Sequence, residues 1–318
     1  MFRNLSTFGL PLTGRSSELI ELTLSFGFDS MDVDILDLEQ QADVYGLDHA
    51  RRLMVSARLQ NGTFRLPLEL SAEDERFDAD LAALPKRLEL AAAADARRAV
   101  TTVQPGSDEH SFKDHFEFVR RRLDRIGELL SPLGMQLGIA VIPESDRREG
   151  LANPFIHTLE GLVGLVSASH PQTGVVIDAW AMHITGESPS LINAIPRGRI
   201  VEVRVSDAPR DVAAAELTAA QRLLIGDSGV IGLTPIREAA KAAGFEGPVT
   251  PWAARAALAG RGRERIVRLA GDRLQSAWAA AGLPMIPRWF IPVANETGDQ
   301  EIIGLIGAVG DEGRGRPV

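Results

Sequence analysis

The sequence has 318 residues, 45% of them hydrophobic, which is enough to bury a sizeable core in one large α/β domain or in two smaller ones. Its net charge of −9 disfavours nucleic-acid partners, because phosphate binding requires a clustered basic face. The absence of cysteine excludes disulfides, thiolate catalysis and cysteine-ligated zinc.

Strand and helix patterns alternate through the first half of the chain. Ser16 or Ser17 can cap a helix that Gly27 closes. Apolar and acidic residues then alternate over residues 27–35, which predicts a strand with Asp32 and Asp34 on one face. Further helices are predicted over residues 47–59, 80–96 and 112–130, and further strands over residues 63–70, 97–106 and 135–143.

The second half contains the two most informative strands. In residues 173–186 a β-branched run leads to Asp178, and strand alternation would place Val176, Asp178 and Trp180 on one face. A buried carboxylate there requires a partner or a metal. Residues 198–209 alternate as well, with Glu202 and Arg204 on a polar face that indicates a barrel lumen. Helices are predicted over residues 158–169, 232–243 and 263–281, and a last strand over residues 245–252.

About eight such alternations without a change in composition predict a single (β/α)₈ TIM barrel. A doubly wound sheet is the alternative, but no glycine-rich phosphate motif follows the first strand. We expect residues 1–286 to form the barrel. Residues 287–318 would form a C-terminal extension, partly apolar and with a flexible end. This extension could cap the base of the barrel or contribute to a subunit contact.

Four pieces of the second half occur in a familiar order: the strand with Asp178 followed by aromatic residues, then VRVSDAP, QRLLIGDSGVIGL and AAGFEGPVTP. With them the chain resembles the sugar phosphate isomerase/epimerase group of the xylose-isomerase-like TIM barrel superfamily, over most of residues 5–282. The resemblance implies one divalent metal, held by Glu, Asp, His and Glu on strands five to eight, while the two Glu residues shuttle a proton.

Carried over position by position, the resemblance makes Asp178 the strand-six ligand, but the other three positions hold Ala140, Arg204 and Trp252. Arginine is always protonated and would repel a cation. We therefore expect no metal at the family's position and no other cofactor. We also expect an ion pair between Asp178 and Arg204 across neighbouring strands.

Seven residues are candidates for the site. Histidine is the residue type best suited to acid/base chemistry near neutral pH, and Glu202 shares the strand face of Arg204, so His183 and Glu202 are the catalytic candidates. Arg222 matches a substrate-side loop of the family, and the two tryptophans could stack on a sugar or fill the volume of the lost metal cage. The predicted ligand-binding residues are Asp178, Trp180, Arg204, Arg222 and Trp252. Other carboxylates that could carry a raised pKa are Asp32, Asp34 and Glu144.

Two functions remain open. The first is a sugar or sugar-phosphate isomerase/epimerase-like protein that binds a small polyhydroxy ligand at the C-terminal face of the barrel and, if active, transfers protons without the metal. The second is a non-catalytic family member that serves as a binding or partner subunit. A third reading, an endonuclease-IV-like enzyme, lacks the necessary histidine cluster and basic groove. With no apolar run of membrane-spanning length, we expect a cytoplasmic protein with a carbohydrate-like ligand and no nucleic acid or membrane partner. Self-association into a homo-oligomer stays an open option.

Overall fold

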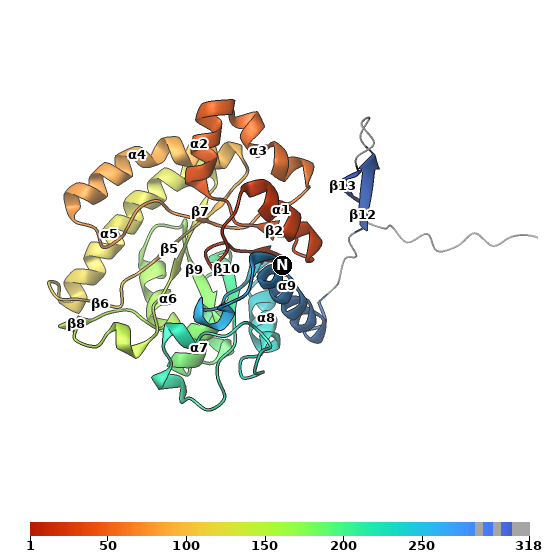
Figure 1. The fold of residues 1–318 in the computed structure, drawn as a ribbon. Coiled ribbons are helices and arrows are strands. Elements are labelled where there is room, and N and C mark those ends of the chain that lie inside the picture. The colour runs from red at the N-terminus through yellow and green to blue at the C-terminus, as the bar shows by residue number, and fades with distance from the viewer. Residues whose placement is uncertain (284–288, 295–299, 307–318) are drawn as a thin grey trace, which may run out of the picture.

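The computed structural model describes residues 1–283, 289–294 and 300–306, and its centre is a ring of parallel strands surrounded by helices (Figure 1). The nine-stranded sheet has the order β3-β2-β1-β11-β10-β9-β7-β5-β4. Its strands are β1 (Phe2–Leu5), β2 (Ser30–Met31), β3 (Gln60–Asn61), β4 (Phe64–Arg65), β5 (Arg98–Thr102), β7 (Gln136–Ala140), β9 (Thr173–Asp178), β10 (Ile200–Val205) and β11 (Pro248–Pro251).

The two ends of this strand order lie next to each other in the chain. Strand β3 pairs with β2 and strand β4 pairs with β5, and only Gly62 and Thr63 separate β3 from β4. One interrupted third strand therefore closes the sheet into a ring. The predicted (β/α)₈ barrel is confirmed.

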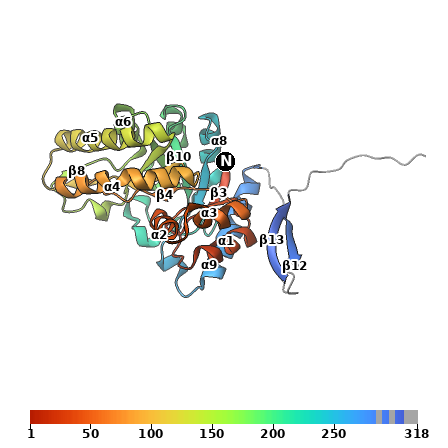
Figure 2. The ribbon, with the colours of Figure 1, turned by 90° about the horizontal axis from the view of Figure 1, so that it is seen from above.

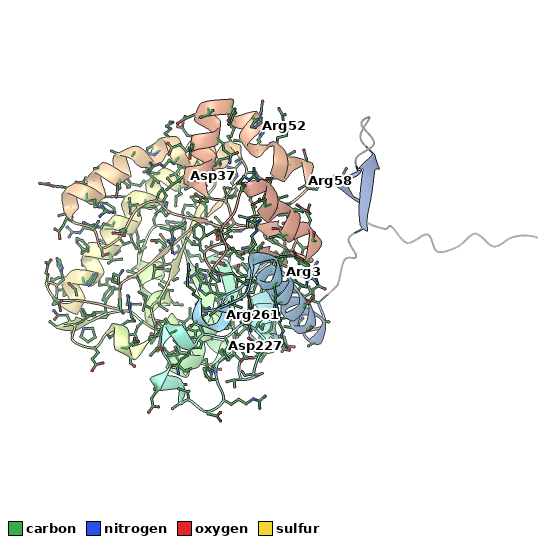
Figure 3. All side chains as sticks on the ribbon, viewed as in Figure 1. Arg3, Asp37, Arg52, Arg58, Asp227 and Arg261 are labelled. Atoms are coloured by element: carbon green, nitrogen blue, oxygen red, sulfur yellow. The ribbon has the colours of Figure 1, made fainter. Side chains whose placement is uncertain are left out.

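Helices cover the outside of the ring, and Figure 2 shows α4, α5 and α6 outside the strands. The α-helices are α1 (Ser16–Ser25), α2 (Ile35–Tyr45), α3 (Leu47–Ser56), α4 (Asp74–Ala93), α5 (Phe112–Leu130), α6 (Leu159–Ala168), α7 (Ala179–Thr185), α8 (Leu233–Ala242) and α9 (Arg263–Ala280). Charged side chains such as Arg52 on α3 lie on their exposed faces (Figure 3). Within the described part of the chain, no helix has the length and apolar character needed to cross a membrane.

Short elements complete the description. Strands β6 (Gly106–Ser107) and β8 (Asn153–Pro154) pair with each other, as do β12 (Trp289–Ala294) and β13 (Gln300–Ile306). The 3₁₀-helices are η1 (Ser131–Leu133), η2 (Ser145–Arg147), η3 (Pro189–Ala194), η4 (Ala214–Glu216), η5 (Ala219–Gln221) and η6 (Ala256–Leu258). The predicted flexible end of the C-terminal extension lies outside the described residues.

Two aspartates begin helices at positions where the alternation predicted a strand or its continuation. Asp34 is not a strand residue but the N-cap of α2, where its Oδ1 accepts hydrogen bonds from the backbone N–H of Leu36 and Asp37. Asp178 caps α7 in the same way, accepting from the backbone N–H of Trp180 at 3.0 Å. Trp180 therefore lies on a helix and does not continue the strand face of Asp178. Aspartate is a preferred N-cap because its carboxylate satisfies free amide groups of the first turn.

A bulge changes the facing of β10. The register of β10 against β9 shifts between Ile200 and Glu202. Val201 consequently joins a small separate apolar cluster with Val100, Ala140 and Val176, whereas Val203 belongs to the main core between the strands and helices. Uninterrupted alternation would place Val201 and Val203 on one face. The extra residue of the bulge lies before Glu202, so regular alternation resumes from Glu202 onward. Glu202 and Arg204 therefore share a face.

The contact between α1 and α9 provides a test of this packing. A Cβ atom at Gly271 on α9 would overlap the backbone oxygen of Phe26, whereas one at Gly164 on α6 would meet nothing within 4 Å. We expect Gly271→Ala to lower the free energy of unfolding by about 1–3 kcal/mol. Gly164→Ala is the control and should raise it by up to about 1 kcal/mol, because alanine is the better helix former. Urea unfolding measures both, and equal effects of the two substitutions would contradict the described contact.

Candidate functional site

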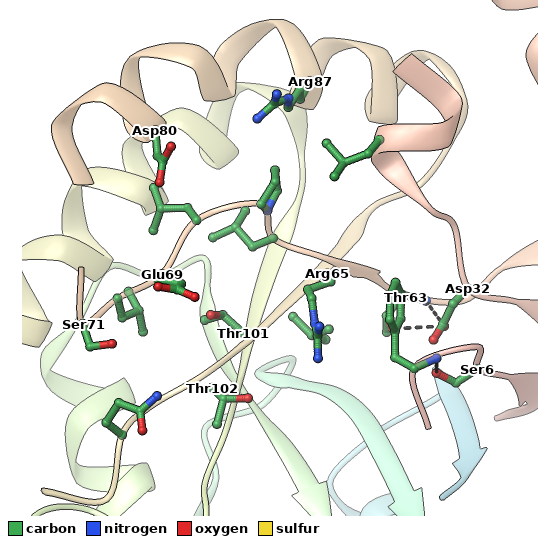
Figure 4. A pocket seen from close by; sticks show the side chains of 18 of the residues that line it. Ser6, Asp32, Thr63, Arg65, Glu69, Ser71, Asp80, Arg87, Thr101 and Thr102 are labelled. Atoms are coloured by element: carbon green, nitrogen blue, oxygen red, sulfur yellow. Dashed lines mark hydrogen bonds between the residues drawn. The ribbon is translucent and has the colours of Figure 1, made fainter. Parts of the chain in front are cut away.

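The carboxyl ends of the strands open onto a cavity of about 650 Å³ (Figure 4). Residues on its wall lie at or just beyond the strand ends: Asp32 follows β2, Arg65 ends β4, Thr102 ends β5 and Trp252 follows β11. Arg204 reaches the same cavity from β10. This is the face on which TIM barrels carry their sites, because the loops after the strands are free to vary there.

A second cavity of about 260 Å³ shares Thr102, Arg204 and Trp252 with the first. Asp178 and Arg222 line it as well. The structure therefore brings together four of the five predicted ligand-binding residues on the walls of two cavities that share three residues. Trp180 is the exception.

Asp178 forms its ion pair with Arg222, not with Arg204 as predicted. The Arg222 Nη1 and Nη2 atoms donate to Oδ2 and Oδ1 of Asp178 at 2.9 and 2.6 Å, and Arg222 Nε donates to Ser206 Oγ at 3.1 Å. Arg204 is indeed the cross-strand neighbour of Asp178. Arg222, however, meets the carboxylate with both terminal nitrogens, which is the stronger geometry. Burial lowers the pKa of the Arg222 guanidinium, and the charge of Asp178 opposes that shift.

The loop after β10 holds Arg222 in place. Asp207 and Leu223 exchange two backbone hydrogen bonds of 2.9 Å, and the backbone oxygen of Arg222 accepts from Ala254 at 2.8 Å. The Asp207 carboxylate also accepts from four successive backbone amides, those of residues 228–231, at 2.6–3.0 Å. This anchoring gives Asp207 a structural role.

Arg204 is held from two sides. Its Nε donates to Glu202 Oε2 at 2.9 Å, and its guanidinium carbon lies 4.0 Å from the centre of the Trp252 ring. Glu202 has no solvent exposure and is absent from the walls of both cavities. Among the described residues, its Oε1 atom has no hydrogen-bond partner. Glu202, a predicted catalytic residue, thus lies behind Arg204, where it orients the guanidinium.

Trp180 and His183 lie away from the cavity walls. The Trp180 ring is fully buried, and its Nε1 donates to Glu144 Oε1 at 2.8 Å, so neither ring face is open for a ligand to stack on. His183 is half-buried in the last turn of α7 and is not among the residues that line either cavity. Trp180 instead packs behind the smaller cavity, where it contacts the wall residues Glu144 and Arg222.

Asp32, one of the three further carboxylates considered for a raised pKa, lies on the wall of the larger cavity. Its Oδ1 accepts hydrogen bonds from the backbone N–H and hydroxyl of Thr63 at 2.8 and 3.0 Å (Figure 4). The same oxygen accepts from Asn4 Nδ2 at 2.8 Å. Burial, together with the nearby charge of Glu202, raises the pKa of Asp32 to about 6. A carboxyl group with such a pKa can accept or donate a proton near neutral pH. In the sequence, only the strand alternation over residues 27–35 indicated that the Asp32 side chain could reach the site.

Trp252 forms a wall of the site and leaves the cavities open. A Cβ atom at Gly9 would lie 2.6 Å from the Trp252 ring, so the loop after β1 packs directly on that ring. Arg204 also lies against the ring, and these contacts fix its orientation. Both cavities remain beside it.

The side chains at the four positions that the resemblance assigns to metal ligands do not fit a divalent cation. Ala140, Asp178, Arg204 and Trp252 all line the smaller cavity, so the positions do converge. Alanine and tryptophan provide no ligand, arginine is cationic, and both oxygens of Asp178 accept from Arg222. In the part of the chain that the structure describes, no group of three or more His, Asp or Glu side chains could hold a metal ion.

The raised pKa of Asp32 makes a prediction for stability. The folded chain binds this proton with a pKa of about 6, against an ordinary value of 3.8, so the protonated form favours folding. We expect wild type to be most stable, relative to Asp32→Asn, below about pH 4. This advantage should fall by up to about 3 kcal/mol as the pH rises to about 6. Urea unfolding across this range measures it, with the exposed cap variant Asp34→Asn as control, and parallel pH profiles for wild type and Asp32→Asn would contradict it.

Solved structures with the same fold are numerous. A xylose isomerase domain protein from Alicyclobacillus acidocaldarius subsp. acidocaldarius is 25% identical, with a TM-score of 0.80 over 89% of this chain and 99% of that chain. The IolI protein with a bound zinc atom is 14% identical, with a TM-score of 0.73 over 88% of this chain and 99% of that chain. D-psicose 3-epimerase with D-tagatose, from Clostridium cellulolyticum H10, is 14% identical, with a TM-score of 0.69 over 88% and 99%.

No curated protein matches the sequence. The family model described as xylose isomerase-like TIM barrel matches residues 20–268. This match covers β2 to β11 and every residue of the two cavity walls except Ser6 and Phe8. The chain therefore belongs to the xylose isomerase-like TIM barrel family.

Proposed function

We propose that the protein is a sugar isomerase/epimerase-like protein that binds a small polyhydroxy ligand at the C-terminal face of its barrel. The observation that supports this most is the cavity of about 650 Å³ at the strand ends, a volume in the range of small-molecule sites. Its wall combines hydroxyl groups of Thr63, Thr101 and Thr102 with the rings of Phe8 and Trp252. Sugars present hydroxyl edges and apolar C–H faces, which suit these two kinds of side chain.

The chemistry of isomerisation and epimerisation is the transfer of a proton next to a carbonyl group. Asp32 is the acid/base group in this proposal. Its carboxylate removes the proton from the carbon next to the carbonyl, the electron pair of the C–H bond forms a C=C bond, and the π pair of the carbonyl moves onto its oxygen. For isomerisation, Asp32 then delivers a proton to the former carbonyl carbon, while the proton of the neighbouring hydroxyl group passes to the former carbonyl oxygen. The guanidinium of Arg204 on the same wall favours negative charge on the ligand, whether permanent or developing.

Ligand binding can be tested by closing the cavities without changing a charged group. Thr102 lines both cavities, and Thr102→Phe would place a ring where they meet. Calorimetry is used to screen sugars, polyols and sugar acids of four to six carbons. We expect at least one of them to bind wild type, and to bind Thr102→Phe at least about tenfold more weakly. Thr13→Phe, at an exposed position on neither wall, is the matched control. Unchanged binding by Thr102→Phe would place the ligand elsewhere.

A non-catalytic binding subunit is the second candidate, because Ala140, Arg204 and Trp252 replace three of the ligands that the resemblance implies. Exchange with solvent separates the two candidates. An isomerase or epimerase returns a proton that has equilibrated with water, so NMR should show deuterium entering the ligand in D₂O. Asp32→Asn should reduce this exchange by at least about a hundredfold. Binding without exchange in wild type would favour the binding subunit.

A further inference from the structure

Arg204 carries hydrogen-bond donors that the protein leaves open. The residue is 8% exposed and lies on the walls of both cavities. Glu202 accepts from Nε, but Nη1 and Nη2 donate to no other described residue. A buried guanidinium without hydrogen-bond partners is costly. Because Arg204 lines both cavities, a ligand bound there can accept from these donors.

The surroundings of Arg204 define which edge is open. Glu202 holds the Nε side, and the Trp252 ring, itself packed on Gly9, lies along one face of the guanidinium. The edge that remains carries Nη1 and Nη2. Two parallel N–H groups on one edge match the two oxygens of a planar carboxylate, with one hydrogen bond to each oxygen.

The charges around the cavities favour a monoanion over a dianion. The walls carry six arginines and five carboxylates, and Glu202 behind Arg204 adds a sixth carboxylate. A phosphate group would bring about two negative charges to these balanced walls, whereas a carboxylate brings one. The arginines are Arg65, Arg76, Arg87, Arg147, Arg204 and Arg222, and the wall carboxylates are Asp32, Glu69, Asp80, Glu144 and Asp178.

We propose that the ligand is a sugar acid whose carboxylate binds the Nη1 and Nη2 atoms of Arg204 and whose hydroxyl groups extend along the threonine side of the larger cavity. This inference rests on the proposed function, since it assumes that the cavity binds a polyhydroxy molecule. It assigns to Arg204 the selection between acids and neutral sugars.

Matched pairs of ligands test the proposal on the full chain. Each aldonate of four to six carbons, such as D-gluconate, is compared by calorimetry with the alditol of the same configuration, such as D-sorbitol. At least one aldonate should bind wild type about tenfold or more tightly than its alditol, because a hydrogen-bonded charge pair is lost in the alditol. Arg204→Gln should abolish the preference, and Arg204→Lys should retain part of it, since lysine keeps the charge without the two parallel donors.

The outcomes separate this inference from the proposed function. Equal binding of aldonates and alditols by wild type would overturn the inference and leave the proposed function standing. Binding of neither class, nor of any sugar, would overturn both. Competition by inorganic phosphate at the concentration of the aldonate would show a general anion site and overturn the choice of a carboxylate. The wild-type comparison decides the question even if the Arg204 variants fail to fold.

Discussion

The ion pair between Asp178 and Arg222 is the interaction on which the rest of the site depends. It places two opposite charges at the carboxyl ends of the strands with two hydrogen bonds between them, which offsets much of the cost of removing both from water. Because Asp178 also caps α7, the same carboxylate fixes the turn from strand to helix. The loop of Arg222, the helix α7 and the end of β9 are thereby tied to one point.

This arrangement changes what the barrel end can do. A carboxylate saturated by a guanidinium has no free oxygen to offer a cation, and the second arginine, Arg204, brings a further positive charge to the same cavities. Positive charge that belongs to the protein cannot be exchanged or removed by chelation. It is also directional, since a guanidinium donates hydrogen bonds within its plane, whereas a metal ion accepts ligands from several directions.

The sequence was sufficient for the architecture because the barrel depends on a repeated local pattern. The bounds of α5, the strand that leads to Asp178 and the convergence of Asp178, Arg204, Arg222 and Trp252 all follow from periodicity and the family resemblance. The partner of Asp178 did not follow, because Arg222 comes from a loop 44 residues further along the chain. Cross-strand adjacency alone favoured Arg204. Strand register predicts which backbone positions are neighbours, but not which arginine side chain can form two hydrogen bonds to the carboxylate.

Asp32 was one of three carboxylates that the sequence offered for a raised pKa, but the burial and the neighbouring Glu202 that single it out arise only in the folded chain. Asp32 lies beside the point where the barrel closes. At the break between β3 and β4, the backbone N–H of Thr63 donates to Asp32 Oδ1, while the backbone oxygen of Thr63 accepts from Val33 at 2.9 Å. The point where the ring closes and the group that titrates therefore share one hydrogen bond. Protonation of Asp32 favours the fold as a whole, but it also removes the charge from the acceptor of this one hydrogen bond. The hydrogen-exchange rate of the Thr63 amide, corrected for the intrinsic effect of pH on exchange, therefore reports the protonation of the cavity wall.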